Sequence, residues 1–278
     1  MAIDLQPVPA VFDLEVAHRR CRQIRRRILE TSQKHGAIHV GGSFSCLEMI
    51  DTIYHGLMRK TMEGDYWDTF VLSKGHGSMV WYVVLEYLGI MPTEDIETYC
   101  TRDGRLGMHP DRGTPGIMTS TGSLGHGLGM AAGMALHDKV FKEERTLYVV
   151  MSDGELQEGS VWEIFLQAPA LGLTSLVAFV DNNNLQSMDF TDHSHPNFYP
   201  LVDKIEAFGW EVVELDGHDQ DAIYQAVTSR SGDRPFLVVG KTVKGKGVSY
   251  MENVPMWHYR SPNAEEYQQA LSELSDEE

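Results

Sequence analysis

The feature of this sequence that most limits its fold is an alternation between short apolar runs and longer helical stretches. β-Branched and aromatic residues dominate the runs, which are Thr69–Leu72, Leu147–Met151, Ser175–Asp181, Glu211–Leu215 and Phe236–Val239. Helical stretches of about ten or more residues separate most of them. This alternation predicts an α/β fold in which a parallel sheet is covered by helices on both faces. Such sheets bind ligands beyond the carboxyl ends of their strands, so the turns after the strands are candidate sites.

A carboxylate and an amide follow two of these runs. Asp153 comes after the run that ends at Met151, and Asn183 follows the next run. If the two runs are neighbouring strands, both side chains lie at one edge of the sheet, and their oxygens suit Mg²⁺. Gly154 lets a phosphate approach the backbone, and a helix expected to begin near Leu156 offers free N–H groups. Two ordinary Asx-rich turns explain the same spacing equally well.

Glycine-rich and histidine-bearing loops supply further candidates. The run from Thr121 to Gly127 leads into a glycine- and alanine-rich stretch, which lets a helix pack closely while its preceding loop exposes backbone to a flat ligand. This run has neither the dinucleotide GxGxxG arrangement nor the GxxxxGK[ST] of a P-loop. Four histidines lie in Gly- or Pro-containing loops and are expected to converge on one polar pocket, where neutral imidazoles can move protons. They are His39, His76, His109 and His258.

Composition excludes several classes of protein. The 278 residues include 40 acidic and 23 basic side chains, and the formal net charge of −17 argues against a nucleic-acid or anionic-membrane partner. Three cysteines without CxxC spacing predict reduced thiols. The sequence shows no N-terminal signal and no apolar run long enough to cross a bilayer. We therefore expect a cytoplasmic protein with no nucleic-acid and no membrane partner.

The two ends of the chain carry charged segments. Asp13 is placed to cap a first helix, and six arginines between Arg19 and Arg27 fall on the face opposite its apolar positions. We interpret that face as solvated or partner-facing, with a phosphate site as the alternative. The acidic segment from Ala264 to Glu278 is expected to be a solvated tail that can form a helix.

Taken together, these features resemble the N-terminal, diphosphate-binding domain of the transketolases. The resemblance covers about Ala17 to Pro262 and rests on motifs in the family's order: IHVGGS, LSKGHGS, GMHPDR, TSTGSLGHG, SDGELQEGS, VDNNN, LDGHD and KTVKGKG followed by WH. It implies a thiamine-diphosphate-binding fold over residues 1–262, with an acidic C-terminal tail at 263–278. It also implies thiamine diphosphate and Mg²⁺ as cofactors, with Ca²⁺ or Mn²⁺ able to replace the magnesium.

The resemblance also assigns roles to individual positions. Asp153, Asn183 and the carbonyl of Leu185 match the family's metal ligands. The positions that match cofactor-binding residues are His76, Gly122, Leu124, Asp153, Gly154, Glu158, Asn183 and His258. His39, His109 and His258 match catalytic histidines that line the ketose channel. Glu158 matches a carboxylate that links paired active sites, although a first-turn helix acid favoured by the dipole would look the same.

Two departures from the family pattern have consequences. Ser152 replaces the first glycine of the usual GDG, and we expect a local adjustment there rather than loss of the cofactor. The chain has no counterpart of the pyrimidine-binding domain, whose glutamate protonates the cofactor. The resemblance thus implies the N-terminal subunit of a split transketolase, active as an α₂β₂ complex with a C-terminal subunit. This complex would move a two-carbon ketol unit from a ketose phosphate to an aldose phosphate.

Three alternatives stay open at this point. The same architecture can act on an unusual branched or sulfonated sugar phosphate, or on a secondary-metabolite substrate. The α chain of a 2-oxoacid dehydrogenase E1 shares the diphosphate-and-Mg²⁺ site, although the LSKGH, MHPDR and GSLGHG motifs favour transketolase. A relic of the site could serve as a scaffold, but the intact Asp153, Gly154 and Asn183 argue against decay.

Overall fold

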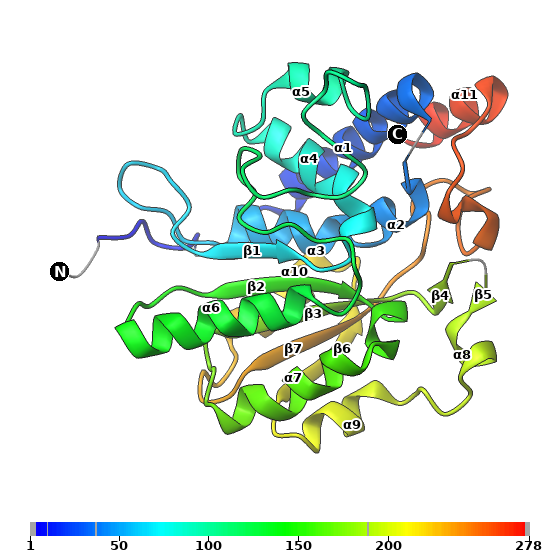
Figure 1. Cartoon of the computed structure of the whole chain (residues 1–278). Coiled ribbons are helices and arrows are strands. Elements are labelled where there is room, and N and C mark those ends of the chain that lie inside the picture. The colour runs from blue at the N-terminus through cyan, green and yellow to red at the C-terminus, as the bar shows by residue number, and fades with distance from the viewer. Residues whose placement is uncertain (1–3, 10, 37, 188, 276–278) are drawn as a thin grey trace.

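A five-stranded parallel sheet forms the centre of the molecule. The computed structural model describes residues 4–9, 11–36, 38–187 and 189–275. The sheet has the order β1-β2-β3-β7-β6 (Figure 1). Its strands are β1 (Thr69–Leu72), β2 (Leu147–Ser152), β3 (Leu176–Asn182), β6 (Glu211–Asp216) and β7 (Phe236–Lys241). Each of the predicted runs is thus a strand, and the predicted parallel sheet is confirmed.

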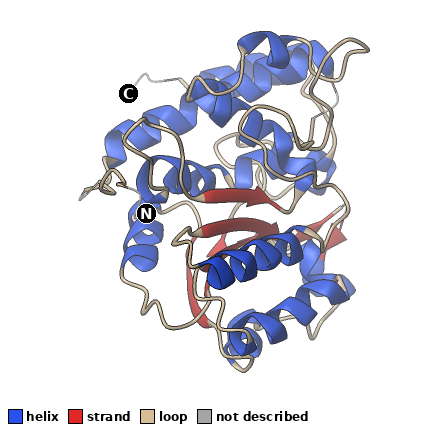
Figure 2. Ribbon diagram, turned by 60° about the vertical axis from the view of Figure 1, so that its left-hand side comes forward, coloured by secondary structure: helices blue, strands red, loops and turns tan. Residues whose placement is uncertain are grey.

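Helices cover both faces of the sheet (Figure 2). The first layer includes α1 (Leu14–His35), α2 (Val40–Ser45), α3 (Leu47–Thr52), the π-helical turn Ile53–Leu57, α4 (Ser78–Tyr87) and α10 (Gln220–Thr228). The second layer includes α6 (Gly127–Phe141), α7 (Gly159–Ala170) and α9 (Leu201–Glu206). Short helices elsewhere are α5 (Thr93–Glu97), α8 (Thr191–Ser194) and the 3₁₀ turns Gly75–Gly77, Gly154–Gln157 and Pro255–His258. No helix in these described ranges is both long enough and apolar enough to cross a membrane.

Strand β2 shows why the sheet lies between two hydrophobic cores. All six of its residues are buried, as expected for a central parallel strand. Tyr148 and Val150 join the core under the first layer of helices, whereas Val149 and Met151 join the core under the second. On that second side, Ala131 and Ala135 of α6 are fully buried, so the small residues of this helix do allow close packing.

The register of β2 and β3 brings their carboxyl ends together. The two strands are parallel neighbours, and Ser152 lies opposite Asp181. The turn that begins at Asp153 and the turn that includes Asn183 therefore leave the sheet side by side. Two short antiparallel strands, β4 (Leu185–Gln186) and β5 (Asp189–Phe190), continue from the second turn.

Helix α1 confirms one prediction and corrects another. Asp13 caps it by accepting a hydrogen bond from the Val16 amide. The arginine-rich face, however, is not uniformly solvated, because Arg20 and Arg25 are buried. These two side chains form ion pairs with acidic residues of α3, which the helical pattern of α1 alone does not reveal.

The C-terminal segment also differs from the expected solvated tail. Residues Ala264–Glu273 form α11, which begins with a capping box made by Asn263 and Glu266. Ala270 and Leu274 are buried against the first core. The solvated interpretation is therefore wrong for the side of this segment that includes Ala270 and Leu274, and residues 276–278 of the expected tail lie outside the described range.

Candidate functional site

A cavity of about 770 Å³ opens at the carboxyl ends of β2 and β3. Most of the predicted site residues line it: His39, His76, Gly122, Leu124, Gly154, Glu158, Asn183, Leu185 and His258. The remaining two are Asp153, which is buried between lining residues Ser152 and Gly154, and His109, which packs behind Gly122. The structure therefore brings the predicted residues together, and their roles stay predictions.

Asp153 is a buried carboxylate held by backbone amides. Its Oδ1 accepts a hydrogen bond from Gly154 N at 2.8 Å, and its Oδ2 accepts one from Asn184 N at 2.5 Å. Burial raises the pKa of Asp153 to about 7, and the nearby Asp181 carboxylate adds to the rise, while the two amides oppose it. No described lysine, arginine or histidine forms an ion pair with Asp153. A buried carboxylate in this state is suited to a cation.

Asn183 and Leu185 complete an oxygen-rich corner beside Asp153. The Asn183 side chain lines the cavity, and its Oδ1 accepts a hydrogen bond from Leu185 N at 3.1 Å. The two turns approach so closely that a Cβ atom on Gly154 would lie 3.1 Å from Cβ of Gln186. A carboxylate, an amide oxygen and a backbone carbonyl are the donors that Mg²⁺ and Ca²⁺ prefer. The residues present thus fit a hard divalent cation.

The backbone after Asp153 corrects the expectation of a helix starting near Leu156. Residues Gly154–Gln157 form a short 3₁₀ turn, Glu158 is extended, and α7 begins only at Gly159. Ser152 contributes to this turn because its Oγ accepts a hydrogen bond from Glu155 N at 3.3 Å. The long helix therefore begins at Gly159, three residues later than expected, and the short 3₁₀ turn follows Asp153 directly.

Three of the four loop histidines cluster on one side of the cavity. The ring centroids of His39, His76 and His258 lie 5.2–5.8 Å apart. Burial lowers the pKa of His39 to about 4 and that of His258 to about 3, and neighbouring cationic groups lower both further. Burial, with Lys74 adding to it, also holds the pKa of His76 well below its usual value. All three imidazoles are consequently neutral at pH 7.

The fourth histidine, His109, borders the cavity through the glycine-rich loop. A Cβ atom on Gly122 would lie 3.0 Å from Cγ of His109, so a side chain at that position would collide with the ring. The loop itself is fixed by Thr121, whose hydroxyl donates to the Leu72 carbonyl, and by Gly125, whose amide donates to Glu155. The glycine-rich loop therefore forms this wall of the cavity, and His109 lies behind Gly122.

Two buried lysines belong to the site, although the sequence patterns alone did not single them out. Lys74 and Lys244 are only 1% and 3% exposed, and both line the cavity. Burial alone would lower the pKa of Lys74, but its ion pair with Asp181 raises that pKa above the ordinary lysine value. Burial lowers the pKa of Lys244 to about 8, and Lys74 adds to this effect. The signal that could have found them is their position in the LSKGHGS and KTVKGKG motifs.

The carboxylates near α7 occupy different environments. Glu158 is exposed at the rim of the cavity. Glu155 is fully buried, and its Oε1 accepts hydrogen bonds from Ser73 Oγ and Gly125 N. Glu155 therefore ties the turn after β1 to the glycine-rich loop, a role that the sequence did not predict.

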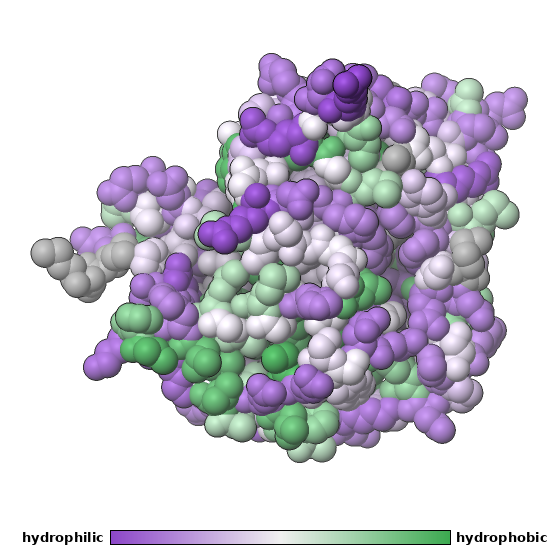
Figure 3. Space-filling view, viewed as in Figure 1, coloured by the Kyte–Doolittle hydropathy of each residue, from purple (hydrophilic) through white to green (hydrophobic). Residues whose placement is uncertain are grey.

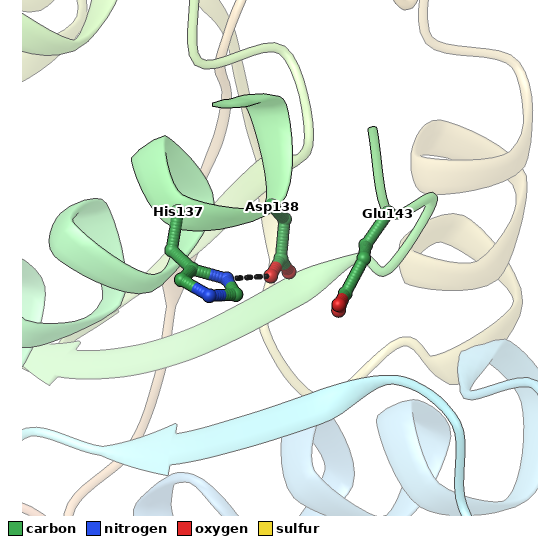
Figure 4. A group of neighbouring side chains, drawn as sticks. All are labelled: His137, Asp138 and Glu143. Atoms are coloured by element: carbon green, nitrogen blue, oxygen red, sulfur yellow. Dashed lines mark hydrogen bonds and ion pairs between the residues drawn. The ribbon is translucent and has the colours of Figure 1, made fainter. Parts of the chain in front are cut away.

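A second group of potential metal ligands lies at the C-terminal end of α6 (Figure 4). It consists of His137, Asp138 and Glu143. Arg145 donates to Asp138 and also forms an ion pair with Glu143 at 2.6 Å. Because the Arg145 guanidinium already pairs with both carboxylates, we assign no metal to this group.

Comparison with known proteins gives a consistent result. Residues 16–275 match the family described as transketolase, thiamine diphosphate binding domain. The chain is 37% identical over 271 residues to an apulose-4-phosphate transketolase subunit of Phocaeicola vulgatus, covering 95% of this chain and 96% of that protein. It is 38% identical over 260 residues to 6-deoxy-6-sulfo-D-fructose transketolase subunit SqwG of a Clostridium species, covering 91% of this chain and 94% of that protein.

Full-length transketolases are similar over part of their length. The structure of transketolase from Campylobacter jejuni superposes with a TM-score of 0.85 at 24% identity, covering 95% of this chain and 43% of that one. The human transketolase-like protein 2 is 31% identical over 257 residues, which is 41% of its length. The chain therefore spans less than half the length of these proteins, and the structural likeness confirms the predicted fold.

Proposed function

This chain belongs to the transketolase family, within its thiamine diphosphate binding domain, and from that premise we propose that it is the cofactor-binding subunit of a two-component transketolase. The observation that carries the proposal is the convergence, around one cavity, of a buried carboxylate, an amide oxygen, two buried lysines and a group of neutral histidines. The 2-oxoacid dehydrogenase alternative is not favoured, because the family match covers residues 16–275 and names transketolase.

Each part of the cavity suits one part of the cofactor. Asp153, Asn183 and the Leu185 carbonyl would hold Mg²⁺, with Ca²⁺ or Mn²⁺ as substitutes. Lys244 and His76 would face the diphosphate, and Gly154 would let it approach the backbone. The backbone of the loop at Gly122 and Leu124 would face the aminopyrimidine ring. When bound, thiamine diphosphate supplies the chemistry that takes a ketol unit from a ketose and gives it to an aldose.

The histidines would handle protons on the sugar side. Lys244 Nζ lies 2.8 Å from Nδ1 of His258, and a charged lysine can only donate. Nδ1 of the neutral His258 therefore accepts that hydrogen bond, and its proton resides on Nε2. A neutral imidazole in this tautomer can donate to a sugar hydroxyl or carbonyl oxygen. We propose that His39 and His109 act on the other substrate hydroxyls.

A second chain is needed to complete the enzyme in this proposal. The relatives named as transketolase subunits match this chain over nearly their whole length, whereas full-length transketolases are more than twice as long as the matched part. We propose a C-terminal subunit that carries the pyrimidine-binding domain, arranged with this chain as α₂β₂. Glu158, exposed at the rim, is suited to contact another subunit.

The substrates would be a ketose phosphate donor and an aldose phosphate acceptor. A specialised sugar is the second candidate, because relatives that are 37–38% identical are named for apulose-4-phosphate and 6-deoxy-6-sulfo-D-fructose. A panel of ordinary, branched and sulfonated sugars would distinguish these possibilities once the partner subunit is present.

Titration calorimetry tests the proposal most directly. Thiamine diphosphate with Mg²⁺ is titrated into this chain alone and then into its complex with a candidate C-terminal subunit. We expect binding that tightens when the partner is present, followed by ketol transfer only in the complex. Absence of binding in both settings, or full transfer by this chain alone, would refute the proposed function.

A further inference from the structure

The hydroxyl of Tyr199 reaches both turns of the oxygen-rich corner. Its Oη donates to Asn182 Oδ1 at 3.0 Å and lies 3.5 Å from Asp153 Oδ2 and 3.4 Å from Asn184 Oδ1. A phenol has a single proton to donate, so these three oxygens share one donor. Tyr199 is far from Asp153 in the sequence and belongs to none of the recognised motifs.

Tyr199 belongs to the segment that follows Asn184, and this segment is hydrogen-bonded back to Asn184. In Figure 1 this segment runs through β4, β5 and α8 beside the carboxyl ends of the strands. The Thr191 amide donates to the Asn184 carbonyl at 2.9 Å, and the Asp192 amide donates to Asn184 Oδ1 at 3.1 Å. The buried Phe198 ring packs edge-on against Tyr199, with 5.0 Å between centroids. The Phe198 contact and the hydrogen bonds to Asn184 therefore help to place the Tyr199 ring beside the Asn182–Asn184 turn.

Asn184 connects this segment to the carboxylate. Its backbone is in the left-handed region, with φ of 59°, and its amide donates to the same Asp153 oxygen that Tyr199 approaches. The Gly154 amide holds the other oxygen. Gly154 and Asn184 thus fix the two oxygens from the backbone, and the Tyr199 side chain contacts Asp153, Asn182 and Asn184.

We propose that Tyr199 is a positioning residue for the divalent cation: its hydroxyl keeps the Asp153 carboxylate in register with the Asn182–Asn184 turn. The inference rests on the proposed function, because it presupposes a cation at Asp153 and Asn183. Outer groups that orient metal ligands typically contribute about 10–100-fold to metal affinity. Mg²⁺ demands near-ideal octahedral geometry, whereas Ca²⁺ tolerates flexible geometry, so loss of positioning costs Mg²⁺ more than Ca²⁺.

The test compares Tyr199→Phe with a matched control. Tyr199→Phe keeps the ring and its packing on Phe198 but removes Oη. The control is Tyr250→Phe, which removes a hydroxyl that donates to the Glu266 carbonyl at 2.6 Å and does not line the cavity. Mg²⁺ and, separately, Ca²⁺ are titrated calorimetrically into each protein with saturating thiamine diphosphate and the partner subunit. Amide hydrogen exchange at Asn184 is measured without ligands.

We expect Tyr199→Phe to weaken Mg²⁺ binding by about 10–100-fold, to weaken Ca²⁺ binding less, and to speed exchange of the Asn184 amide. Tyr250→Phe should bind Mg²⁺ and Ca²⁺ with near-wild-type affinity and leave the exchange rate of the Asn184 amide unchanged. If Tyr199→Phe keeps the wild-type affinity for Mg²⁺, or loses affinity for Mg²⁺ and Ca²⁺ by the same factor, the positioning role is overturned while the proposed function stays intact. If the wild-type protein itself binds no Mg²⁺ with thiamine diphosphate, the proposed function fails and this inference fails with it.

Discussion

At the residue scale, Asp153 carries most of the proposed chemistry. It is fully buried, and burial raises its pKa to about 7. The negative charge of this carboxylate is therefore unfavourable unless a cation lies beside it. We predict that Asp153→Asn weakens Mg²⁺-dependent binding of thiamine diphosphate by about a hundredfold or more, since a direct ligand should exceed the effect of an outer partner. Calorimetry measures this loss. Asp189→Asn, at an exposed carboxylate lining the same cavity, is the control and should bind normally.

Asp153 and Lys244 together predict the pH dependence of cofactor binding. A proton competes with the cation for Asp153, so affinity should fall as the pH drops below about 7. Lys244 has a pKa near 8, lowered by burial, so affinity for the diphosphate should fall as the pH rises above that value. Calorimetric titrations at pH values from about 5.5 to about 9.5 should therefore give the highest cofactor affinity between about pH 7 and about pH 8. Lys244→Arg keeps its charge and should remove the alkaline fall; persistence of that fall would contradict the role of Lys244.

At the scale of elements, helices α1 and α3 are joined by buried ion pairs. Arg25 pairs with Glu48, which also accepts a hydrogen bond from His218, and Arg20 pairs with Asp51. Burial would raise the pKa of Glu48, but Arg25 and His218 outweigh it and lower that pKa to about 2. Because the folded-state value lies below the unfolded one, this carboxylate stabilises the fold above about pH 4.5, and the contribution is lost as the pH falls towards 2.

We predict that Glu48→Gln lowers the free energy of unfolding by about 3–5 kcal/mol at pH 7, because it leaves the buried Arg25 without a counter-charge. Urea denaturation measures this change. The control is Glu15→Gln, which removes the exposed pair with Arg19 and should cost less than about 1 kcal/mol. Equal effects of the two substitutions would show that the buried pair contributes no more than a surface pair.

The same elements show what the sequence could predict. The strands and the Asp153 and Asn183 turns were predictable, because β-branched runs are local signals and polar turns follow them. The motifs that contain Lys74 and Lys244 mark these lysines as candidates, but their burial is set by tertiary packing and could not be predicted. The Arg20 and Arg25 pairs were missed for the same reason, since helical periodicity in α1 contains no information about acidic residues of α3.

At the scale of the whole molecule, the surface of the second helical layer carries an apolar patch. We define the α6–α7 face by its exposed apolar side chains Leu136, Val140, Phe141, Leu166 and Leu171. Val140 and Phe141 are each 66% exposed, and Leu166 is 57% exposed. Figure 3 shows hydrophobic residues gathered over these helices. Exposed apolar patches of this kind mark interaction surfaces, and we expect the C-terminal subunit of the proposed complex to cover this face.

We predict that the double substitution Val140→Glu and Leu166→Glu weakens complex formation with the C-terminal subunit by at least about a hundredfold, because two charges would have to be desolvated in the interface. Sedimentation velocity of the purified mixture measures assembly, and circular dichroism confirms that the variant is folded. Met62→Glu, at a methionine that is 62% exposed outside this face, is the control and should assemble normally. Undiminished assembly of the double variant would place the partner elsewhere, whereas selective loss would explain why a chain with a net charge of −17 leaves this surface apolar.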